Sequence, residues 1–138
     1  MLKLLRAQGL NSTGLSVVFN ALVLGKVMYA SQAFCGHLQV TDFLARIQSC
    51  LDKAYKWGFT TVRFNIEDLF DAADNKLFNN VSINAEHCLH SLLPPKRELF
   101  GRQLRSRDHN FQLPQIRTAL FKSTFINRCL FKSLRLMG

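Results

Sequence analysis

The sequence of 138 residues contains few of the residues that cross-link or interrupt a chain: four cysteines, three prolines and seven glycines. No two cysteines form a CxxC pair, which argues against a disulfide framework and against a zinc knuckle. We therefore expect the cysteines to be small buried hydrophobic side chains. They are widely spaced, at Cys35, Cys50, Cys88 and Cys129.

Acidic residues are scarce too, with 9 Asp and Glu against 18 Lys and Arg, so the net charge is +9. Such an excess of cations favours polyanions as partners. The excess is uneven, because residues 1–93 carry 8 basic and 7 acidic side chains whereas residues 94–138 carry 10 basic and 2 acidic ones. This charge pattern predicts a near-neutral body followed by a basic arm after Pro94-Pro95.

The N-terminus lacks a sustained apolar core followed by a cleavage site, so we do not expect a signal peptide. The most apolar stretch, residues 14–30, is interrupted by Ser16, Asn20 and Lys26. These polar residues favour a buried core helix over a membrane span, and we expect no membrane partner. A location inside the cell, nuclear or cytoplasmic, fits these features.

Twelve phenylalanines and a mean hydropathy of +0.03 exclude wholesale disorder. No segment alternates with the period of a β-strand, whereas several repeat with the period of a helix. The expected fold is all-α, a small helical bundle over residues 1–93 followed by a basic, partly irregular C-terminal arm over residues 94–138. Helices are predicted over residues 15–34, 41–57, 66–78, 83–92 and 115–134, the last of them cationic and amphipathic.

Capping residues support these boundaries. Ser12 or Thr13 is placed to cap the first helix, and Asn65 the third. Thr41 would cap the second helix, and Gly58 stands just past its end. Residues 96–114 show no periodicity, and we expect them to be extended.

Helix 41–57 has two distinct faces. Its predicted core face consists of Phe43, Leu44, Ile47, Leu51, Ala54 and Tyr55. Another face carries Arg46, Lys53 and Lys56 at helical spacing, with Ser49 between them. This basic stripe (Arg46, Lys53 and Lys56) is either a solvated surface or a contact for a polyanion.

Helix 66–78 is predicted to bury Leu69, Phe70, Ala73 and Leu77. Its acids Glu67, Asp71 and Asp74 are expected to face water along the other side. Acids on one helix face do not converge on a metal, since a two-metal site draws its carboxylates from different elements.

Two further motifs resemble sites only in part. Residues 9–16 have the glycine spacing of a phosphate loop, but Leu15 stands where the lysine is required, so nucleotide binding is not expected. The other motif consists of side chains that can ligate a metal: His87, His90, His109 and Cys129, with Cys88 between the first two. It lacks the second pair of ligands that a zinc site needs. We expect these side chains to pack and form hydrogen bonds, and whether they bind metal stays open.

Several motifs occur together in the C-terminal part. They read HCLHSLLPP at residues 87–95, LRSRDHNFQLP at residues 104–114 and STFINRCLF at residues 123–131. With residues 22–29 and 54–58 upstream, their order and spacing resemble the C-terminal end of reverse transcriptases encoded by non-LTR retrotransposons, including the jockey-like elements.

The resemblance implies a fragment of an RNA-directed DNA polymerase, with a thumb-like helical bundle over residues 1–93 and a basic tail. The family's metal-binding aspartates, one pair of them in a Tyr-x-Asp-Asp strand, have no counterpart here, so no catalysis and no cofactor are expected. The implied role is residual binding of template and primer, as RNA, DNA or an RNA–DNA hybrid, through phosphates. The expected contacts are Arg102, Arg105 and Arg107, carrying most of the affinity, together with the basic stripe.

Two other interpretations stay open. The bundle is alternatively a helical protein-interaction module without a nucleic-acid role, or the chain is a pseudogene product without function. A small-molecule substrate is not expected, because no nucleophile, base and orienting group occur together.

Overall fold

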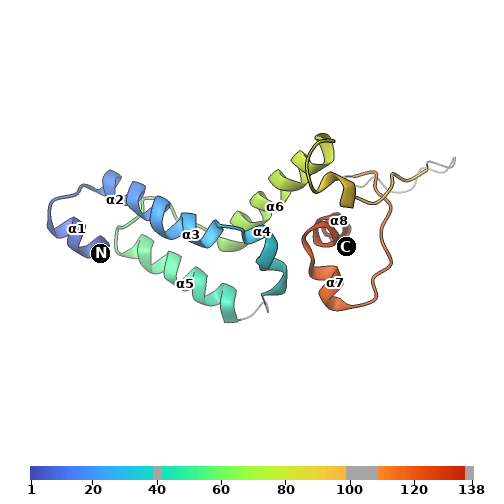
Figure 1. The fold of residues 1–138 in the computed structure, drawn as a ribbon. Helices are drawn as coiled ribbons and strands as arrows, with labels where there is room; N and C mark the ends of the chain where they lie inside the picture. The colour runs from blue at the N-terminus through green and yellow to red at the C-terminus, as the bar shows by residue number, and fades with distance from the viewer. Residues whose placement is uncertain (39–41, 99–108, 136–138) are drawn as a thin grey trace. The chain divides into compact units, whose positions relative to one another are not determined.

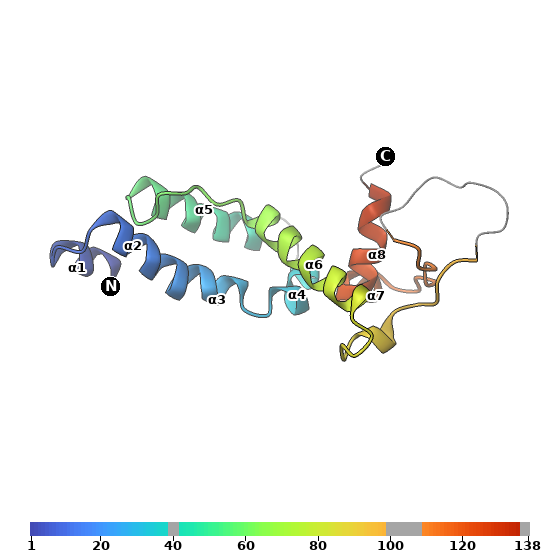
Figure 2. The same ribbon diagram turned by 90° about the horizontal axis from the view of Figure 1, so that it is seen from above.

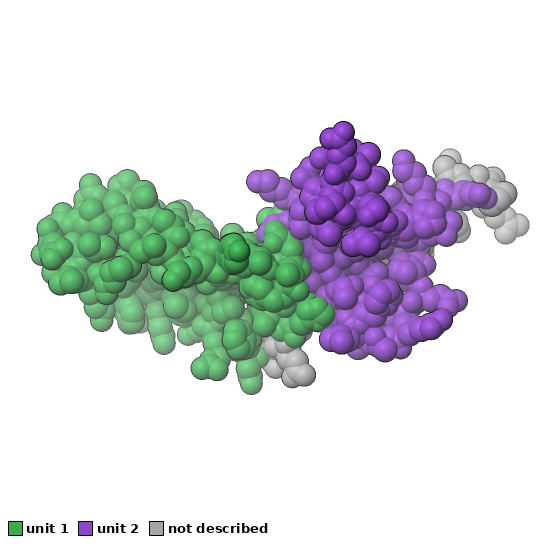
Figure 3. All heavy atoms as spheres, viewed as in Figure 1, with its two compact units in different colours: residues 1–72 green, residues 73–138 purple. Residues whose placement is uncertain are grey.

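The computed structural model describes residues 1–38, 42–98 and 109–135, with the side chains of residues 133–135 excepted. Helices dominate these ranges, which contain no strand and only one isolated antiparallel bridge, between Lys96 and Phe111 (Figure 1). The all-α prediction is confirmed. The chain divides into two compact units, residues 1–72 and residues 73–138 (Figure 3).

Both units are built from short helices. The first contains α1 (Leu2–Ala7), α2 (Ser12–Phe19), the π-helical turn η1 (Asn20–Leu24), α3 (Gly25–Met28), α4 (Ser31–Phe34), η2 (Cys35–His37), α5 (Asp42–Lys56) and the start of α6 (Ile66–Ile83). The second contains the rest of α6, η3 (His90–Leu92), α7 (Ala119–Ser123) and α8 (Phe125–Arg135). The boundary between these two units lies within α6, because His109 and Arg128 contact the second half of this helix.

The predicted first helix is interrupted. It begins at Ser12 with Asn11 as its cap, not Ser12 or Thr13, because Asn11 Oδ1 accepts the Gly14 N–H at 2.8 Å. The wider turn η1 follows α2, and α3 ends at Met28. Ala30, just before α4, adopts the left-handed conformation with φ of 52°. This conformation is strained for a residue with a Cβ, and it separates α4 from α3.

The stretch Ser12–His37 is also far less buried than expected. By length and composition it is apolar enough to cross a membrane, yet only 11% of its most apolar window is buried. Val17, Leu22 and Tyr29 are 62%, 44% and 81% exposed. The expectation of a surrounded core helix is wrong, because α5 and the segment after it lie along only one side of this stretch (Figures 1 and 2).

The core of the first unit joins residues far apart in sequence. Two of them, Leu51 and Ala54, come from the predicted core face of α5, whereas Phe43 and Tyr55 of that face are 55% and 47% exposed. The buried cluster consists of Phe19, Leu51, Ala54, Phe59, Ile66 and Phe70. Phe43 and Tyr55 lie at the edges of the helical face, beyond the reach of the one layer that covers it.

Helix α5 ends at Lys56, shortly before Gly58, as the sequence predicts. Gly58 has φ of 73° and donates its N–H to Tyr55 O at 3.0 Å, while the Phe59 N–H bonds Ala54 O at 2.9 Å. This pair of bonds is the Schellman motif, whose left-handed position favours glycine. The turn directs Phe59 into the core, where it is 5% exposed.

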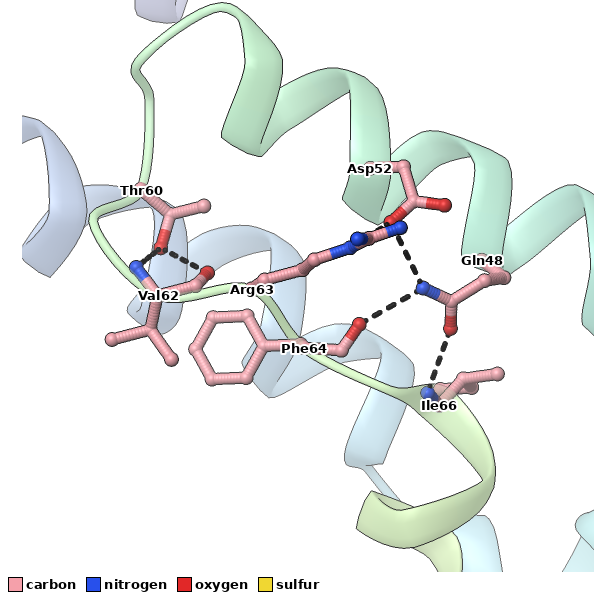
Figure 4. A network of polar contacts seen from close by, with 7 residues as sticks. All are labelled: Gln48, Asp52, Thr60, Val62, Arg63, Phe64 and Ile66. Carbon is pink, nitrogen blue, oxygen red and sulfur yellow. Dashed lines mark hydrogen bonds and ion pairs between the residues drawn. The ribbon is translucent and has the colours of Figure 1, made fainter.

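One side chain of α5 holds the segment that follows this turn (Figure 4). Gln48 Nε2 donates to Phe64 O at 2.9 Å, and Gln48 Oε1 accepts the Ile66 N–H at 2.9 Å. Gln48 also donates to Asp52, whose carboxylate pairs with Arg63 at 3.1 Å. These bonds fix where α6 begins.

Helix α6 starts as predicted but runs further. Asn65 Oδ1 accepts the N–H groups of Glu67 and Asp68 at 3.0 and 3.3 Å, which confirms the cap. The helix continues to Ile83 because Val81 is fully buried in the second unit. The predicted helix 83–92 is wrong, since turns and η3 occupy that range.

The predicted helix 115–134 is two helices. Thr118 caps α7 by accepting the Phe121 N–H at 3.1 Å, and α7 ends at Thr124, whose ψ of 152° is extended. Asn127 Nδ2 then donates to Phe121 O at 2.8 Å, which ties the start of α8 to α7. Cys129 and Leu130 of α8 are buried, whereas Leu120 of α7 is 69% exposed.

The prediction that Asp74 of α6 faces water is wrong. Its side chain is 5% exposed, and both its oxygens bind the guanidinium of Arg128, each at 2.9 Å. Arg128 also donates to Ser123 O at 2.9 Å. A buried carboxylate needs such a partner because its desolvation is costly. The pair joins α6 to α8 within the second unit.

We expect Asp74→Ala to lower the free energy of unfolding by about 3–5 kcal/mol, because it leaves the largely buried charge of Arg128 without its carboxylate. The matched control is Arg63→Ala, which breaks an ion pair whose arginine side chain is 71% exposed. That change should cost about 1 kcal/mol or less. Urea unfolding followed by circular dichroism measures both.

Replacing both partners, as Asp74→Leu with Arg128→Met, should restore much of the stability lost in Asp74→Ala. An Asp74→Ala variant as stable as Arg63→Ala would contradict a structural role for this pair.

Candidate nucleic-acid interface

The basic stripe is a continuous exposed face of α5. Arg46, Lys53 and Lys56 are exposed and follow one another at seven and three residues, so they share one side of the helix. Leu51 and Ala54, on the other side, are buried. The core therefore fixes which way the stripe faces.

Neither ion pair within the described residues uses a cation of the stripe. Asp52 lies one turn before Lys56, but its carboxylate already accepts from Arg63 and Gln48. Asp42 lies one turn before Arg46, at the N-terminal end of α5. The C-terminal half of the stripe is thus the part richest in uncompensated positive charge.

Helix α1 brings further cations to that end of α5. The Lys3 ammonium lies 5.0 Å from the ring centroid of Trp57, and Arg6 Nη1 donates to Trp57 O at 2.7 Å. The Arg6 guanidinium also lies 5.1 Å from the ring of Phe59. Sequence reasoning missed these residues, because Lys3 and Trp57 are distant along the chain and no local pattern joins them.

A shallow apolar groove adjoins the other end of the stripe. It has a volume of about 350 Å³. Arg46 is the one charged residue among those that line it, which are Val23, Val27, Phe43, Arg46, Ile47, Cys50 and Leu51. An apolar wall with a cation at its rim suits a partner's apolar side chain as well as a phosphate.

The structure describes only part of the basic arm. Arg102, Arg105 and Arg107, the main predicted contacts, lie outside the described residues. Arg128, one of the cations of the predicted amphipathic helix 115–134, is bound to Asp74 and is not available to a polyanion. Lys122 lies 5.6 Å from the ring of Phe131.

The three histidines of the predicted metal-ligand motif make structural contacts. His109 is 8% exposed; its Nε2 donates to Leu130 O at 2.9 Å and its Nδ1 accepts the Phe111 N–H at 3.3 Å. Its ring lies at 6.0 Å from that of Phe78, in the core of the second unit. His90 Nδ1 donates to Val81 O at 2.7 Å, and His87 Nδ1 accepts from the Leu89 N–H at 3.1 Å.

These contacts fit the expected packing and hydrogen bonding. Among the described residues, no group of three or more His, Cys, Asp or Glu side chains is arranged to hold a metal ion. All four cysteines lie in the described residues and none forms a disulfide. The prediction that they are buried is wrong for Cys50 and Cys88, which are exposed.

Comparison of the chain with protein-family models, with curated proteins and with solved structures finds no match. The assignment of a role to the interface therefore rests on its geometry and on the motifs in the sequence.

Thiol labelling tests the placement of the cysteines. Cys50 and Cys88 should react rapidly with a maleimide in the native protein, whereas Cys129, which is 8% exposed, should react only after unfolding in guanidinium chloride. Mass spectrometry of the labelled peptides identifies the sites. Labelling of Cys129 as fast as that of Cys50 would contradict the packing of α8.

Proposed function

We propose that this chain binds nucleic acid through its phosphate backbone, and that the basic stripe of α5 is one contact surface. The observation that carries the proposal is that Arg46, Lys53 and Lys56 share one exposed face of a helix whose opposite face is anchored in the core. The resemblance to the thumb-like end of retrotransposon reverse transcriptases supports the same role, with a template and primer as the partner.

The dimensions of the stripe suit a phosphate backbone. Arg46 and Lys56 are ten residues apart, which corresponds to about 15 Å along a helix. Phosphates follow one another at about 3.4 Å of rise per strand, so the stripe spans about four steps. Contacts of this kind position a duplex without reading its sequence, and an A-like hybrid is recognised mainly by shape and backbone.

The groove beside Arg46 favours a second candidate, a protein-interaction module. Phe43, which is 55% exposed, lines that groove, and exposed apolar surface of this kind marks protein interfaces. Salt distinguishes the two functions. Affinity for nucleic acid falls steeply with salt because bound counterions are released, whereas an apolar contact is much less sensitive.

Neutralising the stripe tests the proposal. The triple variant Arg46→Ala, Lys53→Ala and Lys56→Ala should bind a short RNA–DNA hybrid more weakly, whatever its sequence. The slope of log K against log salt should fall by up to about 2.7, since each phosphate contact contributes about 0.9. Fluorescence anisotropy with a labelled hybrid, titrated at several salt concentrations, measures both quantities.

The control triple variant removes the same charge elsewhere. Lys26→Ala, Lys76→Ala and Arg117→Ala replace exposed cations outside the stripe, so both variants keep a net charge of +6 against +9 for the parent. The control should bind almost like the parent. Equal losses of affinity in the two variants would show that binding depends on net charge alone, and the stripe would then not be a specific contact surface.

The arm is tested in parallel with Arg102→Ala, Arg105→Ala and Arg107→Ala. If most of the affinity lies in the arm, as the charge distribution predicts, this variant should lose more than the stripe variant. An affinity equal to that of the parent would assign the interface to α5.

We expect no template-directed primer extension by this chain with Mg²⁺. Polymerases of the resembled family hold two metals with aspartates, and the only adjacent acids of this sequence, Glu67 and Asp68, lie in the first turn of α6. A primer-extension assay with the purified chain measures this. Extension that depends on the template would contradict the proposed non-catalytic role.

A further inference from the structure

We infer that Trp57, together with Lys3, Lys53 and Lys56, forms a stacking site for an unpaired nucleobase at the end of the basic stripe. The inference rests on the proposed nucleic-acid binding and deepens it, because it names single-stranded nucleic acid as the partner at this point. We call these four residues the Trp57 corner.

The indole of Trp57 is exposed but held in place. Trp57 is 48% exposed, and its backbone N–H donates to Lys53 O at 2.9 Å, which continues the last turn of α5. Its ring packs edge-to-face on Phe59 at 6.1 Å, and Phe59 is anchored in the core. Arg6 Nη1 donates to the Trp57 backbone carbonyl. A ring that packs on a core residue and is half open to solvent is a preformed platform for a flat ligand.

Lysine side chains adjoin this platform. The Lys3 ammonium lies over one face of the ring, 5.0 Å from its centroid, so a base would stack on the other face or displace this flexible side chain. Lys53 stands one helical turn before Trp57, on the same face, whereas Lys56, the preceding residue, projects about 100° away around the helix and continues the stripe. An aromatic ring flanked by flexible ammonium groups is the combination that single-strand-binding surfaces use, with bases stacked on the ring and phosphates on the cations.

An unpaired base is favoured over an intact duplex for a geometric reason. Within a duplex each base already stacks on its neighbours, so its flat face is not accessible to an indole. A single strand, or an overhang next to a duplex, presents both a free base and a phosphate. The site is continuous with the stripe through Lys53, so a duplex on the stripe can continue into a single strand at Trp57.

The chain carries its own probe, because Trp57 is its one tryptophan. Stacking on a nucleobase quenches indole emission. We would titrate the full chain with a single-stranded oligothymidine and, separately, with a blunt RNA–DNA hybrid, and follow tryptophan fluorescence. Anisotropy of the same oligonucleotides, labelled at one end, would report binding independently. The expected result is strong quenching by the single strand and weak quenching by the hybrid.

Variants separate stacking from charge and from folding. Trp57→Ala should weaken binding of the single strand about tenfold, whereas Trp57→Phe, which keeps a flat ring, should retain most of it. The matched control is Tyr55→Ala, since Tyr55 is 47% exposed but projects from a different side of α5. It should leave the affinity unchanged. Lys3→Ala should lower the salt slope by about 0.7, the contribution of one phosphate contact on a single strand.

The outcomes distinguish the two proposals. If the oligonucleotides bind by anisotropy but the indole is not quenched, and Trp57→Ala binds like the parent, the stacking site is overturned while the proposed function stands. If Tyr55→Ala loses as much affinity as Trp57→Ala, the stacking site is likewise overturned. If neither oligonucleotide binds at low salt, the proposed function fails and the inference fails with it.

Discussion

The first unit depends on the amide of Gln48, which connects α5 to the start of α6. Residues 57–65 form no regular element, so their backbone groups lack the partners that a helix supplies. Gln48 provides both kinds of partner from a half-buried position, accepting from Ile66 and donating to Phe64. These bonds place Phe59, Phe64 and Ile66 on the core, and they fix the first turn of α6. An apolar residue of the same size would leave both backbone groups without partners.

Because Gln48 holds the following segment against one side of α5, the two sides of this helix have different roles. Its inner side supplies Leu51 and Ala54 to the core, and its outer side is left for charge. The Schellman turn at Gly58 then separates neighbouring aromatic residues, with Phe59 buried and Trp57 half exposed. An exposed aromatic ring and a row of cations consequently lie on one helix without weakening its packing. The proposed interface needs no mobile element for its assembly, since folding alone produces it.

Local signals predicted the all-α class, the Asn65 cap, the end of α5 and the placement of the basic stripe. Each depends on residues within a turn or two of one another. The errors have a different cause. Asp74 has the sequence spacing of a solvated acid, and only its pairing with Arg128, far along the chain, explains its burial. Lys3 reaches Trp57 through the same kind of distant contact. The strained Ala30 and the break at Thr124 carry no glycine or proline, so sequence did not indicate them.

The π-helical turn η1 has a consequence for how this helix can change in length. Leu15, Phe19, Val23 and Val27, which contact the core or are buried, recur at every fourth residue. In a regular α-helix that spacing drifts around the axis, because a turn has 3.6 residues. The wider turn at Asn20–Leu24 accommodates an additional residue and keeps the later side chains on the core side. In evolutionary terms, one codon can be lost within this turn, and the helix then closes into an ordinary α-helix without a break.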